Sequence, residues 1–148
     1  METVIEIVRI KQVTKKRSAK HLLNRISAPF IAAEILQKEI GDEDREVFMV
    51  LCLNTKHEVT AIYRCHVGSI NATIVHPREV FKAALLNNST SIVVGHNHPS
   101  SDVTPSREDI TMTQRLVEAG KILGVTVLDS LVVGSTSNFT SLKEKGYL

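Results

Sequence analysis

The sequence predicts an α/β fold in which helices flank a central sheet. Three apolar runs of strand length, at residues 47–53, 92–94 and 125–133, alternate with segments whose apolar residues recur at helical spacing. A chain that mixes strands and helices in this way buries its core between a sheet and the helices on its faces. Its 148 residues, 43% of them apolar, suit one domain with a single core.

The N-terminal residues predict one strand and two helices. Residues 2–13 are rich in Val and Ile and predict a strand, and residues 15–24 predict a basic helix. A second helix is expected after Ser27, which can serve as its N-cap, with Pro29 tolerated in the first turn. We expect this helix to end at Gly41, because glycine commonly follows the last helical residue.

Positive charge is concentrated in this N-terminal part. The net charge is +2, yet residues 7–33 contain no acidic residue and seven basic ones: Arg9, Lys11, Lys15, Lys16, Arg17, Lys20 and Arg25. Such a segment can contact nucleic acid or an acidic protein, but no aromatic residue is interleaved before Phe30, so a solvated surface is the simpler interpretation. We expect residues 1–41 to form an N-terminal strand and basic helical extension packed on a domain of residues 42–148.

The middle of the chain predicts a hairpin, a loop and a helix. Residues 47–53 predict a central strand, which a short polar turn joins to a second strand at residues 59–63. Residues 64–74 contain glycine, serine and asparagine and predict a loop. A helix is expected to begin at Pro77. His76, directly before it, is expected to make a local hydrogen bond rather than to bind a metal.

The last apolar run, residues 125–133, predicts another strand, which Asp129 interrupts. An acid within a strand is either a buried partner of a functional site or a residue at the sheet edge. The sequence leaves both interpretations of Asp129 open.

Several protein classes are excluded by composition. No apolar run approaches the roughly 20 residues that span a bilayer. The N-terminus lacks the basic start and the small-residue cleavage site of a signal peptide. Cys52 and Cys65 make no disulfide framework, and both are interpreted as structural. We expect a cytoplasmic protein without membrane contact.

The stretch from residue 92 to residue 109 concentrates the metal-binding side chains. A strand at residues 92–94 delivers His96 and His98, and residues two apart on an extended chain share a face. Pro99 and a polar loop follow, and a helix then opens at Ser106 with Asp109 in its first turn. Two imidazoles and one carboxylate leave a fourth tetrahedral position open for water, as in catalytic rather than structural zinc sites.

A simpler interpretation exists for each part of this stretch. Ser106 and Asp109 fit the Ser-x-x-acid pattern, so they can form a helix capping box without any metal. A His-x-His pair also occurs on polar surfaces that bind no metal. The capping and metal interpretations do not exclude each other, and strand, His pair, loop and acid-bearing helix in this order favour a metal site.

The stretch matches the JAMM signature of the JAB/MPN metalloproteases, which is His-x-His, seven residues, Ser, two residues and Asp. The sequence His-Asn-His-Pro-Ser resembles the bacterial RadC-like proteins, as do residues 75–82 before the site and residues 128–134 after it. This likeness spans roughly residues 45–148. It implies a JAB/MPN-like (cytidine-deaminase-like) fold, with a mixed, curved sheet flanked by helices.

Two positions depart from this resemblance. Ser101 stands where the family usually has glycine, and Ser130 stands where it usually has histidine. The first departure can alter the geometry of the loop, because glycine adopts positive φ at little cost and serine does not. Neither departure removes a residue of the signature.

The resemblance also implies roles for five residues. His96, His98 and Asp109 would hold Zn²⁺, and Ser106 would donate a hydrogen bond to the developing oxyanion. Glu46 matches the family's catalytic glutamate at the start of the strand ahead of the His pair, and would serve as the general base. Without the resemblance, Glu46 is simply a solvated acid at the end of a strand.

The function implied is a zinc-dependent metallopeptidase or isopeptidase-type hydrolase with a peptide or isopeptide substrate. A second hypothesis is a DNA-associated, DNA repair-type protein that contacts nucleic acid through its basic N-terminal segment, with the metal site serving a nuclease or a binding module. A third is a catalytically silent scaffold, which the intact signature argues against. The oligomeric state and the specificity are not encoded in any recognisable motif.

Overall fold

The computed structural model describes residues 3–9, 11–13, 25–71 and 73–148, and it confirms the predicted α/β class. A five-stranded open sheet has the strand order β2-β1-β3-β4-β5. β1 pairs antiparallel with β2 and β3, β3 runs parallel to β4, and β4 is antiparallel to β5. The elements are α1 (Pro29–Ile40), β1 (Val47–Leu53), β2 (Val59–Val67), α2 (Pro77–Leu86), β3 (Ser91–Asn97), α3 (Arg107–Leu123), β4 (Thr126–Val133) and β5 (Phe139–Ser141).

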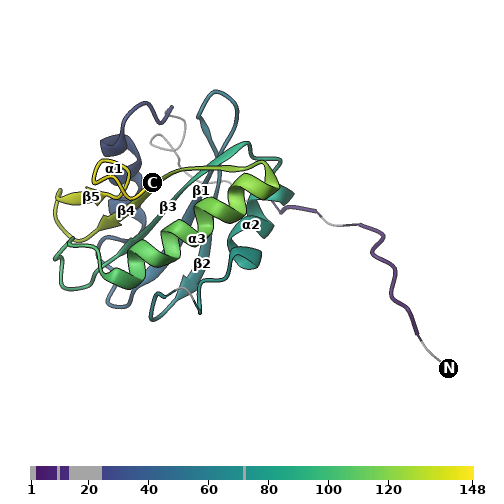
Figure 1. Cartoon of the computed structure of the whole chain (residues 1–148), viewed down its shortest axis with the longest axis horizontal. Coiled ribbons are helices and arrows are strands. Elements are labelled where there is room, and N and C mark those ends of the chain that lie inside the picture. Colours follow the sequence, from purple (N-terminus) through teal and green to yellow (C-terminus); the bar gives the residue numbers. More distant parts are fainter. Residues whose placement is uncertain (1–2, 10, 14–24, 72) are drawn as a thin grey trace.

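Helices cover both faces of the sheet, with α2 and α3 on one side and α1 on the other (Figure 1). Every residue of β1 is buried, because this strand lies near the middle of the sheet. Phe48, Val50 and Cys52 pack on the side of α2 and α3. Met49 and Leu51 pack on the side of α1. The continuous apolar run at residues 47–53 therefore belongs to two cores, one on each face.

α1 packs on β3 at a glycine. A Cβ atom at Gly95 would clash with Leu36 of the helix, so only a residue without a side chain lets the helix lie this close to the sheet. The end of α1 also depends on a close approach. Gly41 has a right-handed φ of −59°, and a Cβ there would lie 2.5 Å from the Gln37 carbonyl oxygen and 2.7 Å from that of Gly134. The predicted helix end at Gly41 is confirmed, but crowding rather than a left-handed backbone requires glycine at this position.

The strand predicted for residues 2–13 is wrong for the residues that the structure describes there. Residues 3–9 and 11–13 form no strand, and Val4 and Ile5 are 91% and 86% exposed. Figure 1 shows this segment extending away from the domain. β-branched composition favours an extended backbone, but a strand also needs a neighbour that takes its hydrogen bonds and buries its side chains. The basic helix predicted at residues 15–24 lies outside the described residues.

Two predicted element ends are shifted. The N-cap of α1 is Ala28, one residue after the predicted Ser27, and no side chain caps this helix. Pro29 occupies the first helical position, where its missing N–H removes one donor that a cap would have to satisfy. β2 also continues through residues 64–67, which were predicted as a loop. A bulge against β1 and the hydrogen bond from the Arg64 guanidinium to the Glu39 carbonyl oxygen (2.8 Å) accommodate polar residues in this edge strand.

Asp129 has neither of the roles considered for it. The residue is 6% exposed, and its carboxylate accepts hydrogen bonds from the Ser130 amide (2.7 Å), the Ser141 hydroxyl (2.6 Å) and the Lys143 amide (3.2 Å). A buried carboxylate with three donors is well compensated. Asp129 thus fastens the C-terminal turn to β4.

Among the described residues, no helix is long and apolar enough to cross a membrane.

Gly95→Ala tests the contact between α1 and the sheet. The added methyl group would clash with Leu36, so we expect the free energy of unfolding to fall by about 1–3 kcal/mol, as overpacked cores do. Urea denaturation measures the loss, with the exposed Thr111→Ala as a control. Gly95→Ala combined with Leu36→Ala should cost less than the sum of the single changes. Additive costs would show that the two positions do not touch.

Candidate metal centre

The two histidines of the signature lie at the end of the central strand β3. This strand continues through Asn97, three residues beyond the predicted end at Val94, so His96 is itself part of the sheet. His96 is fully buried, and its ring stacks on that of Phe48 with centroids 6.4 Å apart. The edge of the domain is reached at His98, which is only partly buried. The sheet therefore holds one imidazole rigidly and presents the other at its rim.

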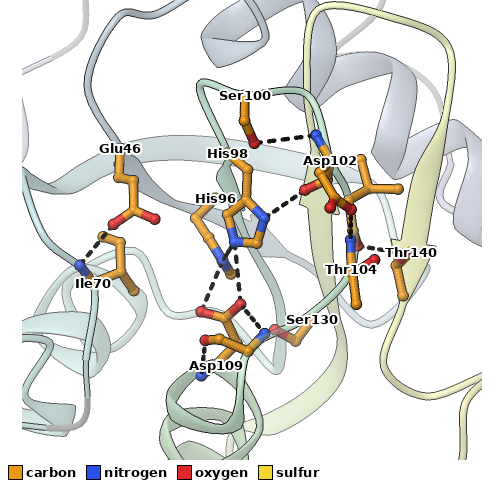
Figure 2. Close-up of polar contacts among 12 residues, drawn as sticks. Glu46, Ile70, His96, His98, Ser100, Asp102, Thr104, Asp109, Ser130 and Thr140 are labelled. Atoms are coloured by element: carbon orange, nitrogen blue, oxygen red, sulfur yellow. Dashed lines mark hydrogen bonds and ion pairs between the residues drawn. The ribbon is translucent and has the colours of Figure 1, made fainter.

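The first turn of α3 positions the carboxylate. The Ser106 hydroxyl oxygen accepts a hydrogen bond from the Asp109 amide (3.0 Å), and Asp109 Oδ2 accepts one from the Ser106 amide (2.8 Å). This reciprocal pair is a capping box, so the capping interpretation of these two residues is confirmed. Asp109 is 2% exposed and points back toward β3 (Figure 2). Capping thus fixes the carboxylate where the metal interpretation also requires it.

Three donor atoms converge at this point. His96 Nε2 lies 3.3 Å from His98 Nε2 and 3.1 Å from Asp109 Oδ1, and His98 Nε2 lies 3.2 Å from Asp109 Oδ2 (Figure 2). Ligands at 2.0–2.1 Å around a tetrahedral ion are separated by about 3.3–3.4 Å. His96, His98 and Asp109 therefore form a group that can hold a metal ion.

The hydrogen bonding of His98 supports a cation at this point. Its Nδ1 lies 2.7 Å from the Asp102 carbonyl oxygen, which can only accept, so Nδ1 carries the proton. In the neutral ring, Nε2 then has a lone pair that faces the carboxylate of Asp109, which is also an acceptor. Two acceptors in contact require a cation between them, either a metal ion or a second proton on His98. The donor set therefore fits a metal.

Ionisation of the carboxylate is strongly favoured. Burial of Asp109 opposes its charge, but the hydrogen bonds from His96 and His98 outweigh this penalty and hold the pKa of the carboxyl well below its usual range. The hydrogen bond to Asp109 in turn raises the pKa of His98, although desolvation opposes it. A carboxylate that stays ionised at neutral pH is the form that binds metals.

Glu46 lies on the same face of the sheet as the histidines. Phe48 pairs with His96 across β1 and β3, so Glu46, two residues before Phe48, is directed toward the same side. Its Oε2 accepts a hydrogen bond from the Ile70 amide (3.0 Å), and Figure 2 shows the carboxylate beside the histidine pair. Its charge also contributes to the raised pKa of His98, after the hydrogen bond to Asp109. Glu46 is therefore not merely a solvated strand end.

The sequence did not indicate three contributors to this arrangement. Asp102 acts through its backbone carbonyl and Ile70 through its backbone amide, and neither role leaves a signal in the sequence. Asn97 is buried; its side chain donates hydrogen bonds to the turn that precedes Glu46 and accepts one from the Val47 amide. Strand alternation could have placed Asn97 on the face opposite the two histidines, but not its partners.

The two departures from the family pattern have different consequences. Ser101 adopts a left-handed φ of 63°, so the loop keeps a conformation that favours glycine. Its hydroxyl oxygen accepts a hydrogen bond from the Ser135 amide (3.0 Å) and lies 2.7 Å from the Ser135 hydroxyl. Ser130 is buried and accepts a hydrogen bond from the Thr113 hydroxyl (2.9 Å). Ser130 is therefore a core residue in this chain.

Comparison with known proteins agrees with this arrangement. The family model of the RadC-like JAB domain matches residues 26–147. The chain belongs to this family. The match begins before residues 45–148, the range of the sequence resemblance, and it includes α1. The RadC-like JAB domain thus contains both helical layers of the fold.

Relatives of the chain are called UPF0758 proteins. One from Desulforamulus reducens is 46% identical over 123 residues, which are 83% of this chain and 54% of that protein. One from Alkaliphilus metalliredigens is 49% identical over 124 residues, 84% of this chain and 53% of that protein. A relative from Clostridium beijerinckii is 42% identical over 146 residues, 97% of this chain and 63% of that protein. The chain spans about half the length of the first two relatives.

Contact with nucleic acid through the basic N-terminal segment stays a prediction. Four of its seven cations, Lys15, Lys16, Arg17 and Lys20, lie outside the described residues. Of the other three, Arg25 is exposed and pairs through its backbone with Glu58. The division of the chain at residue 42 and the cytoplasmic location likewise stay predictions.

Ser101 offers a test of the loop that follows the histidines. Ser101→Ala keeps the left-handed backbone and loses the hydrogen bond to Ser135, so the free energy of unfolding should fall by about 0.5–1.5 kcal/mol. Ser101→Gly loses the same hydrogen bond but relieves a backbone strain of about 1 kcal/mol, so its free energy of unfolding should be close to that of wild type. Urea denaturation of both variants checks the order. Equal stability of the two would mean that the backbone at Ser101 is unstrained.

Proposed function

We propose that this RadC-like JAB domain is a zinc-dependent metallopeptidase that hydrolyses a peptide or isopeptide bond. The observation that carries the proposal is the convergence of His96, His98 and Asp109 within 3.1–3.3 Å of one another, with Glu46 on the same face of the sheet. Two imidazoles and one carboxylate are the donors of many catalytic zinc sites, whereas Mg²⁺ and Ca²⁺ prefer oxygen alone. The proposal therefore assigns the three donors to Zn²⁺.

The ion and Glu46 would share the work of hydrolysis. When bound, zinc would act as a Lewis acid that makes a water molecule acidic near neutral pH and polarises the substrate carbonyl. Glu46 would take a proton as the water attacks the amide carbon, and would pass it to the leaving amine. The hydrogen bond from the Ile70 amide to Glu46 Oε2 holds the carboxylate in one orientation and leaves Oε1 for the proton. One carboxylate would thus serve as base and then as acid.

Ser106 would stabilise the negative charge that develops on the carbonyl oxygen. Its oxygen already accepts the hydrogen bond from the Asp109 amide, but its O–H remains available as a donor. Fixed by the capping box, this hydroxyl would not have to reorganise during the reaction. The cap and the catalytic role are therefore compatible in one side chain.

The family resemblance supports an amide substrate, and the donor set is compatible with hydrolysis of such a bond. The catalytically silent alternative would not need the three donors and Glu46 to be assembled on one face. The DNA-associated alternative rests on the basic N-terminal segment, to which the site geometry adds nothing. A hydrolase acting on peptide or isopeptide bonds is thus the function that the described residues support best.

Metal content is the direct test of the site. Protein purified without chelator or tag histidines should contain about one zinc ion per chain, as other sites of this type do. His98→Ala and Asp109→Ala should lose the ion, because each leaves two protein donors. His76→Ala should retain it, since His76 caps α2 and binds the Arg78 amide. Elemental mass spectrometry provides the measurement, and a wild type that stays free of metal after zinc is resupplied would sink the proposal.

Glu46→Gln separates catalysis from metal binding. The amide cannot accept a proton, so hydrolysis should fall by about 10²- to 10⁴-fold while the metal content stays that of wild type. Activity is measured on a panel of fluorogenic peptides and lysine ε-amide conjugates. Glu58→Gln, a turn residue outside the site, serves as the control and should match wild type. Full activity in Glu46→Gln would remove this residue from the mechanism.

A further inference from the structure

We propose that Asn97 is a positioning residue that fixes Glu46 relative to the two histidines. The catalytic meaning of this inference rests on the proposed function, whereas the hydrogen bonds from which it is drawn do not depend on that function. Asn97 lies between His96 and His98 in the sequence, and alternation along β3 directs its side chain to the opposite face. Gly95, two residues earlier, also faces α1. The turn that joins α1 to β1 and carries Glu46 begins on this side of the sheet.

The Asn97 side chain is fully buried and uses both ends of its amide. Nδ2 donates to the carbonyl oxygens of Glu43 (3.2 Å) and Arg45 (3.0 Å). Oδ1 accepts a hydrogen bond from the Val47 amide (2.7 Å). These contacts join positions about fifty residues apart in the chain and bind the residues directly before and after Glu46.

The hydrogen bonds of the Asn97 side chain lie where the pairing of β1 with β3 ends. The pairing of β1 with β3 stops at Phe48 and His96. One residue further, the Val47 amide is bound by the Asn97 side chain instead of a backbone carbonyl of β3. The main chain can therefore leave the sheet at Glu46 without exposing a buried amide that lacks a partner. Asn97 thus sets the point and direction at which Glu46 departs from β1.

A second set of hydrogen bonds holds Glu46 from the other side. Its carbonyl oxygen accepts from the Gly68 amide (2.8 Å), and its Oε2 accepts from the Ile70 amide (3.0 Å). Glu46 is thereby fixed between β3 and the segment after β2. Loss of the Asn97 contacts would release one side, so the carboxylate would move away from the Ile70 amide and from the face of the histidines.

A positioning role for Asn97 predicts an effect on the reaction rate that a purely structural role would not. A displacement of about 1 Å in a catalytic group can reduce a rate by about 10²-fold, although binding of substrate changes little. The histidines are held by the sheet and by Asp102, so metal binding should not depend on the Asn97 amide. Asn97 would therefore control the reaction rate without controlling the metal content.

The experiment uses the Ile70 amide as a reporter of where Glu46 lies. In the full chain, Glu46→Gln should shift the Ile70 amide resonance, because the hydrogen bond to a carboxylate is lost. The same change is then made in Asn97→Asp, which has the shape of asparagine but cannot donate to the two carbonyl groups. We expect Glu46→Gln to shift the Ile70 amide resonance in Asn97→Asp by less than about half of the shift that it causes in wild type. This comparison is a double-mutant cycle, which detects coupling between the two positions. Asn138→Asp, the same change at an exposed site, should leave it unaltered.

Metal content and kinetics complete the test. Asn97→Asp should retain its zinc, and kcat should fall by about 10- to 100-fold with little change in KM. An unaltered Ile70 shift in a folded Asn97→Asp would overturn the proposal. If Asn97→Asp does not fold, Asn97→Ser is measured in the same way, and failure of both to fold would assign Asn97 to stability alone. A wild type without zinc would refute the proposed function, whereas the Ile70 result would still decide whether Asn97 positions Glu46.

Discussion

The antiparallel register of β1 and β3 determines where each group of the site lies. Phe48 pairs with His96, so residues two apart on both strands face α3 together. A slip of one residue would turn the imidazoles toward α1, where Leu36 fills the space over Gly95. The register is in turn held by two apolar cores, since β1 is buried along its whole length and contributes to both. Hydrophobic packing of the sheet thus sets the geometry of a polar site.

The carboxylate of Asp109 connects the stability of α3 to the chemistry of the site. Asp109 Oδ2 closes the capping box with Ser106 and also faces His98, while Oδ1 faces His96. A buried charge is costly unless it is compensated. Here the compensation comes from the amide of Ser106, from the helix N-terminus and from the two imidazoles. A cation bound by the three donors would therefore stabilise the start of α3 as well as the site.

The His-Asn-His tripeptide uses both faces of one strand. The two histidines are directed toward α3, and the asparagine between them is directed toward the turn that carries Glu46. A strand within a sheet is rigid, so groups on its two faces keep a constant relation to each other. The loop after it is held separately, by Ser101 with Ser135 and by Asp102 with His98. The sheet and the hydrogen-bonded loop together hold the donors in place.

The sequence by itself determined the features that depend on residues close together in the chain. The strand predicted at residues 47–53 is β1, and the helix predicted to open at Ser106 is α3, because apolar periodicity and capping depend on residues near in the chain. The order of strand, His pair, loop and acid-bearing helix, together with the resemblance to the JAMM signature, predicted that His96, His98 and Asp109 would meet, and they do. Tertiary structure alone decided the rest. Residues 3–9 have the composition of a strand but pair with no strand among the described residues, and Asp129 and Asn97 take their roles from groups distant in the sequence. Such contacts form only when the chain has folded, so no local pattern records them.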